Sequence, residues 1–143
     1  MYLTPHFTLD EMTTSQVASR KGLDNTPDSK TIANLVELCK LLEGVRKLVR
    51  QPILVSSGYR SDALNRQVGG SRFSAHTLGL AADIVAVSMA PRELARRVAD
   101  SELKFDQLIL EFDSWVHLGL SEGRQRRQVL TIRKGTGYLP GLQ

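Results

Sequence analysis

Residues 56–84 read SSGYRSDALNRQVGGSRFSAHTLGLAADI, and residues 106–120 read DQLILEFDSWVHLGL. These stretches contain His76, Asp83 and His117, which include two of the chain's three histidines. A catalytic zinc ion takes three protein ligands from His, Asp and Glu and keeps a fourth position open for water. The segment between His76 and Asp83 is rich in Gly and Ala, so its backbone can fold closely around an ion. We therefore expect a three-ligand Zn²⁺ site, although an H-x6-D spacing alone also arises by chance.

The order of motifs around these residues resembles the zinc peptidases that cleave peptidoglycan. This family includes D-alanyl-D-alanine carboxypeptidases and the L-alanyl-D-glutamate endopeptidases of bacteriophage lysis. Its pattern is an SGYRS-type turn, an Asn, a Val-Gly-Gly, S-x-H followed by G-x-A-x-D, and W-x-H on a strand. All of these occur in order across residues 56–120, and FTLDEM near the N-terminus and the basic C-terminal strand are also similar to small phage members. The resemblance covers nearly the whole chain and implies a zinc site at His76, Asp83 and His117.

The resemblance also implies substrate-binding roles for residues near the first motif. Arg60 would hold the substrate carbonyl or carboxylate and stabilise the developing oxyanion, a role that suits a planar guanidinium. The alternative for Arg60 is an ordinary surface pair with Asp62. Ser74 is similar to a family serine that contacts substrate or supports the ligands, but it is equally suited to a turn that bonds its own backbone. Tyr59, with Asn65, is expected to shape the cleft wall.

The identity of the general base stays open. A zinc peptidase needs a carboxylate that takes a proton from the attacking water and passes it to the leaving amine. Several relatives carry this acid three residues before the last histidine, where this chain has Ser114, which cannot act as a base. Glu111 and Asp113 are the catalytic candidates, and resemblance to the EF-x-x-WVH form of the pattern favours Glu111.

Residue alternation predicts which way the last ligand points. In a strand over residues 115–120, Trp115 and His117 share one face, while the other face is uniformly aliphatic and suits a core. His117 is therefore expected to face the cleft. His6 lies in an N-terminal arm without partner motifs, and we interpret it as a solvent-exposed histidine.

Composition is that of an ordinary globular protein, with 41% hydrophobic and 24% charged residues in 143. We expect a single zinc peptidase domain over residues 1–143, acting as a monomer. The net charge of +4 comes largely from a C-terminal basic cluster. No aromatic residues alternate with that cluster to stack bases, so we expect no nucleic-acid partner. Cys39, the only cysteine, excludes an intrachain disulfide and is expected to be a small buried side chain.

Periodicity and turn signals predict an α+β fold. Helices are expected from the capping box at Thr8 to about residue 20, from Thr26-Pro27 to about residue 50, over residues 61–68, and from Pro91. Strands are expected at residues 53–56, 80–87, 107–112, 115–120 and 129–133. Short connections favour a small, mostly antiparallel sheet, with helices packed on one face and the zinc cleft on the other.

These observations predict a zinc metallopeptidase that hydrolyses peptidoglycan stem peptides or cross-links next to D-amino acids, in the manner of a phage or prophage endolysin. The alternative is a non-catalytic virion or cell-wall-binding protein that keeps the zinc fold. The N-terminus lacks the basic and apolar regions of a signal peptide, and no apolar run is long enough to span a bilayer. We therefore expect no membrane insertion, and residence in the cytoplasm of the bacterial host until lysis, before action on the periplasmic cell wall.

Overall fold

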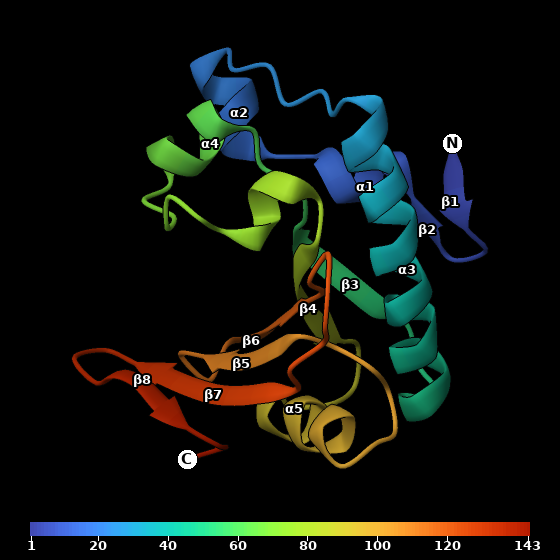
Figure 1. Cartoon of the computed structure of the whole chain (residues 1–143), viewed down its shortest axis with the longest axis vertical. Coiled ribbons are helices and arrows are strands. Elements are labelled where there is room, and N and C mark those ends of the chain that lie inside the picture. The colour runs from blue at the N-terminus through green and yellow to red at the C-terminus, as the bar shows by residue number, and fades with distance from the viewer.

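The computed structural model describes all residues from 1 to 143 and shows an α+β protein built on a six-stranded sheet (Figure 1). The strands lie in the order β3-β4-β6-β5-β7-β8. Every neighbouring pair is antiparallel except β5 and β7, which run parallel. The predicted mostly antiparallel sheet is confirmed. Its strands are β3 (Ile53–Ser57), β4 (Ala81–Ala86), β5 (Gln107–Glu111), β6 (Trp115–Gly119), β7 (Gln128–Arg133) and β8 (Gly137–Pro140).

A small N-terminal hairpin and six helical segments surround this sheet. The hairpin strands are β1 (Tyr2–Thr4) and β2 (Phe7–Thr8). The helical segments are α1 (Leu9–Thr13), α2 (Gln16–Lys21), α3 (Ser29–Val49), α4 (Asp62–Gln67), the 3-10 turn η1 (Ala75–Leu78) and α5 (Pro91–Ala99). None of these helices combines the length and the hydropathy that a membrane crossing requires.

One face of the sheet forms the hydrophobic core. Leu118 pairs with Ala82 on one side and with Leu108 on the other, and all three side chains are fully buried. Because side chains alternate along a strand, the apolar set packs against α3 and α5 while His117 faces the other way. The predicted orientation of the strand at residues 115–119 follows directly from this register.

The placement of the helices is only partly as expected. The two longest, α3 and α5, contribute to the core side, and Figure 1 shows α5 beneath the sheet. The short helices α2 and α4 contact each other, and η1 contacts both α4 and β4. They lie on the other side of the sheet, and η1, in the chain between β3 and β4, carries His76.

Three local boundaries also differ from the sequence interpretation. The helix expected from Thr8 to about residue 20 is two helices, because Thr14 is extended and the Ser15 side chain caps a second one. The long helix begins at Ser29, capped by Asp28, and does not begin at Thr26-Pro27. Strand β8 was not expected, since its Gly- and Pro-containing sequence carries little strand propensity and it pairs only at the sheet edge.

Candidate metal centre

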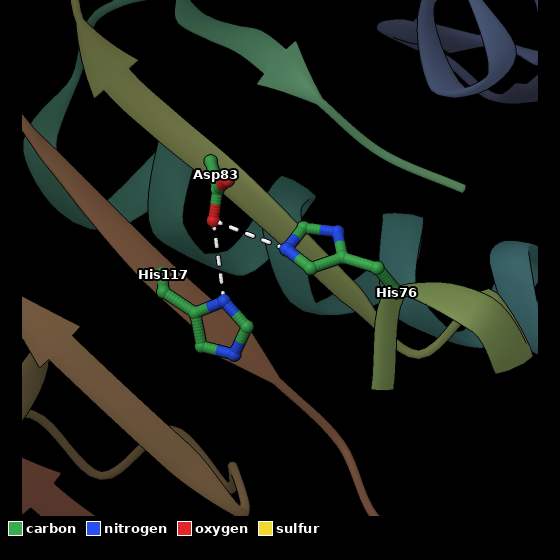
Figure 2. A group of neighbouring side chains, drawn as sticks. All are labelled: His76, Asp83 and His117. Carbon is green, nitrogen blue, oxygen red and sulfur yellow. Dashed lines mark hydrogen bonds and ion pairs between the residues drawn. The ribbon is translucent and has the colours of Figure 1, made fainter. Parts of the chain in front are cut away.

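Three elements bring the predicted ligands together on the polar face. Asp83 of β4 and His117 of β6 are direct cross-strand partners, and His76 approaches them from η1 (Figure 2). Oδ1 of Asp83 lies 3.3 Å from Nε2 of His76 and 3.2 Å from Nδ1 of His117. One ligand atom from each residue lies within 4.8 Å of the others. Tetrahedral zinc with bonds of about 2.1 Å places its ligand atoms roughly 3.4 Å apart, so the cluster fits such an ion.

The imidazole of His76 is oriented by the turn after β3. Its Nδ1 lies 2.7 Å from the carbonyl oxygen of Gly58, which makes Nδ1 the protonated nitrogen and leaves Nε2 free to bind a metal. A side chain at Gly58 would bring its Cβ to 2.4 Å from the backbone oxygen of Met12. The turn can therefore approach both α1 and His76 only with glycine at this position, which gives the Ser-Gly-Tyr motif a structural reason.

The carboxylate of Asp83 is buried and ionised. Burial on its own raises the pKa of this group, but its interactions with the imidazoles of His117 and His76 outweigh burial and hold the pKa well below its ordinary value. Its second oxygen, Oδ2, lies 3.4 Å from Nη2 of Arg60. Arg60 thus takes one oxygen of the carboxylate and leaves the other between the two imidazoles. With Oδ2 bound to Arg60 and Oδ1 between the imidazoles, the carboxylate is suited to bind a metal through Oδ1 alone.

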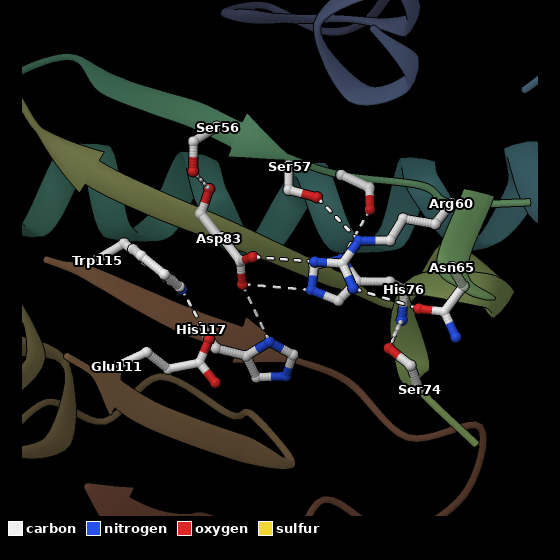
Figure 3. Close-up of polar contacts among 11 residues, drawn as sticks. Ser56, Ser57, Arg60, Asn65, Ser74, His76, Asp83, Glu111, Trp115 and His117 are labelled. Carbon is white, nitrogen blue, oxygen red and sulfur yellow. Dashed lines mark hydrogen bonds and ion pairs between the residues drawn. The ribbon is translucent and has the colours of Figure 1, made fainter. Parts of the chain in front are cut away.

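Arg60 is held by a network that reaches both sides of the site (Figure 3). Its Nε donates to Oγ of Ser57 at 3.2 Å, and its Nη1 donates to Oδ1 of Asn65 at 3.3 Å. Asn65, which is buried, also donates to the backbone oxygen of Ser71. The surface pair of Arg60 with Asp62 does not form; the buried Asp83 takes its place. The loop before His76 is thereby tied to the guanidinium at the site.

A cavity of about 590 Å³ is lined by His76 and His117, two of the three candidate ligands. Glu111 lines it, and its Oε1 accepts a hydrogen bond from Nε1 of Trp115 at 2.7 Å. Asp113 does not line it. That residue sits in the turn between β5 and β6, where Arg133 binds it at 2.9 Å and holds its pKa below the usual range through this hydrogen bond. The structure therefore brings Glu111 to the site and leaves Asp113 outside it.

Of the other residues considered in the sequence, Ser74 lies at the cavity, while Tyr59, His6 and Cys39 lie elsewhere. Ser74 lines the cavity, but its hydroxyl also caps η1 by accepting from the backbone nitrogen of His76. Tyr59 lines a neighbouring cavity beside α1 and α2 and not the one over the metal ligands. His6 pairs with Glu43 at the surface, far from the site in the fold. Cys39 is fully buried, and burial raises the pKa of its thiol to about 12.

Sequence reasoning missed two contributions to the site. The first is the hydrogen bond from Trp115 to Glu111, which the four-residue separation across a tight hairpin makes possible. The second is Ser57, the cross-strand partner of Asp83, which places its hydroxyl beside Arg60. The alternation of residues along β3 indicates which face of the sheet Ser57 lies on. Only the pairing of β3 with β4 shows that Ser57 lies opposite Asp83.

We expect the protein to bind about one equivalent of zinc through His76, Asp83 and His117. Replacing either histidine by alanine removes one of three ligands, so His76→Ala and His117→Ala should each lose most of the bound metal after dialysis. His6→Ala is the matched control and should keep it. Elemental analysis of folded protein measures the outcome, and full retention of zinc by both site variants would contradict the assignment.

Comparison with known proteins identifies the family of the chain. A search among curated proteins found no match. The sequence model of the family described as Peptidase M15 matches residues 5–119, which include the turn at Arg60, all three metal-binding residues and Glu111. The match extends over most of the chain, from the N-terminal hairpin to the end of β6. The chain belongs to the Peptidase M15 family and is therefore a metallopeptidase of a zinc-dependent family.

Proposed function

We propose that this protein hydrolyses peptide bonds in peptidoglycan, in stem peptides or cross-links next to D-amino acids, and that it serves as a phage or prophage endolysin. The observation that carries the proposal is one cavity that is lined both by the two histidines of the His-Asp-His cluster and by the carboxylate of Glu111. A three-ligand metal site with an open position for water and an acid-base group beside it is an arrangement that zinc enzymes use for hydrolysis.

The residues of the site have separate roles in that reaction. His76, Asp83 and His117 would hold the zinc ion, which would supply the activation of water and the polarisation of the scissile carbonyl. Glu111 takes the proton from the attacking water and delivers it to the nitrogen of the leaving amine. Arg60 donates to the oxygen that gains charge when the carbonyl carbon becomes tetrahedral. The fixed position of its guanidinium lowers the reorganisation that this stabilisation needs.

Glu111 is suited to the proton transfer by its position. It is the cross-strand partner of Trp115, and the next pair on the same face is Ile109 with His117. Because residues two apart on a strand share a face, the carboxylate stands one step along the sheet from the metal ligand. The indole of Trp115 binds one oxygen of Glu111, which fixes the carboxylate and leaves its second oxygen for water.

A peptidoglycan substrate is favoured by the sequence pattern of the cleft. The SGYRS turn, the S-x-H segment and W-x-H together resemble enzymes that cleave murein peptides, and FTLDEM resembles small phage members. Action as a monomer of one domain, released from the host cytoplasm to the cell wall at lysis, is part of the same proposal.

One observation favours a second candidate, a wall-binding or virion protein without hydrolysis. Ser114 occupies the position where several relatives carry their general acid-base, and its hydroxyl bonds the backbone oxygen of Phe112 in the turn. If Glu111 does not replace that acid, the site binds metal and peptide but does not turn over. Digestion of purified murein separates the two candidates.

Zinc-loaded protein incubated with purified sacculi should release peptide fragments with new amino and carboxyl termini. No new reducing sugars should appear, because the site is built for an amide and not for a glycosidic bond. Terminal-group analysis and mass spectrometry of the soluble products measure both. A rise in reducing ends alone would overturn the proposed substrate bond, and an unchanged sacculus that still binds the protein would favour the second candidate.

Glu111→Gln should lower turnover about a hundredfold to ten-thousandfold, the usual scale for loss of a general base. The amide still accepts the hydrogen bond from Trp115, so folding and zinc content should stay normal. Asp113→Asn is the matched control, since that carboxylate lies outside the cavity. Normal turnover in Glu111→Gln together with collapse in Asp113→Asn would transfer the role to Asp113.

A further inference from the structure

The last two strands lie beyond the part of the chain that matches the family. The match ends at residue 119, while β7 and β8 occupy residues 128–140. Nevertheless Leu130 of β7 and Tyr138 of β8 line the same cavity as His76 and His117. In Figure 1 this hairpin extends the sheet away from the short helices α2 and α4. The cavity is therefore wider than the matched region alone would make it.

The strand register places these side chains on the face of the metal site. His117 pairs with Ile109, and Ile109 pairs with Leu130, which continues the row that starts at Asp83. The adjacent row runs from Glu111 through Ile132 to Tyr138. Both rows share a face because they are two residues apart. Tyr138 thus stands on the same surface as the carboxylate proposed as the general base.

Hydrogen bonds and an ion pair hold the β7–β8 hairpin in place, and the ring of Tyr138 takes no part in them. Thr131 donates to the backbone oxygen of Gly141 at 2.8 Å, and Arg133 binds Asp113 in the β5–β6 turn at 2.9 Å. In contrast, Tyr138 is 60% exposed. An exposed aromatic ring on a strand whose backbone is fixed is suited to contact a ligand.

We propose that Tyr138, with Leu130, forms a substrate subsite that binds an extended peptide segment remote from the scissile bond. The inference rests on the proposed function, because it takes the occupant to be the peptide that lies over the metal centre. Three strand spacings separate β6 from β8, or roughly 14 Å. An extended chain covers about 3.5 Å per residue, so the subsite is reached about four residues from the bond that is cleaved.

This position gives the subsite a defined kinetic signature. We expect this contact to stabilise the bound substrate and the transition state alike, and the loss of such a contact raises KM while kcat stays unchanged. The effect exists only for substrates long enough to reach β8. A short peptide centred on the metal site should not distinguish the variant from the wild type.

The experiment compares zinc-loaded wild type, Tyr138→Ala and Tyr2→Ala on synthetic murein peptides of defined length, extended stepwise on each side of the cleaved bond. Tyr2 is 70% exposed on β1 and gives a matched loss of an exposed ring outside the cleft. We expect KM of Tyr138→Ala to rise about tenfold on long peptides, the scale of one aromatic contact, with kcat and short-peptide cleavage unchanged. Tyr138→Phe should restore the wild-type KM.

Three outcomes overturn the inference in distinguishable ways. If all variants cleave the peptides and Tyr138→Ala behaves like Tyr2→Ala at every length, the subsite is absent and the proposed function stands. If the wild type neither cleaves nor binds any of the peptides, with binding measured by calorimetry, the proposed function fails and the subsite fails with it. An equal loss of kcat on short and long peptides would also contradict a remote contact.

Discussion

The buried carboxylate of Asp83, held between His76 and His117, is the interaction on which the rest of the structure depends. A charged group with 5% of its surface exposed is costly to bury without partners. Two imidazoles and a guanidinium supply those partners here, and each comes from a different part of the chain. The sheet, the SGYRS turn and the loop before η1 are arranged so that these groups meet at one carboxylate.

The two faces of β4 and β6 show how a small fold supports such a charge. On one face Ile84 and Leu118 are completely buried against the long helices, which fixes the register of the strands. On the other face the same register sets Asp83 opposite His117. The hydrophobic core therefore fixes the strand register that determines the geometry of the polar site. A slip of one residue would exchange the two faces and remove both the core and the site.

Sequence alone predicted the α+β class and the direction of His117, because each rests on a short-range pattern. The grouping of His76, Asp83 and His117 was expected from the order of motifs along the chain, and the structure brings these three side chains together. Alternation over residues 115–119 depends only on the strand period, and the structure bears it out. The partner of Arg60 was not predicted, since Asp62 is near in sequence whereas Asp83 is near only after β3 and β4 pair. The helix break at Thr14 was missed, although the polar run from Thr13 to Gln16 interrupts the apolar spacing and Ser15 is a favourable N-cap residue. Strand β8 has weak propensity and owes its place to pairing with β7.

The most direct test of this account is the structure of the zinc-loaded protein, with the metal located by its anomalous X-ray scattering. The account predicts one ion bound by Nε2 of His76, Oδ1 of Asp83 and Nδ1 of His117, with Arg60 still on the second oxygen of Asp83 and Glu111 facing the open coordination position. An ion located elsewhere, or one that leaves the carboxylate of Asp83 bound only to Arg60, would contradict it.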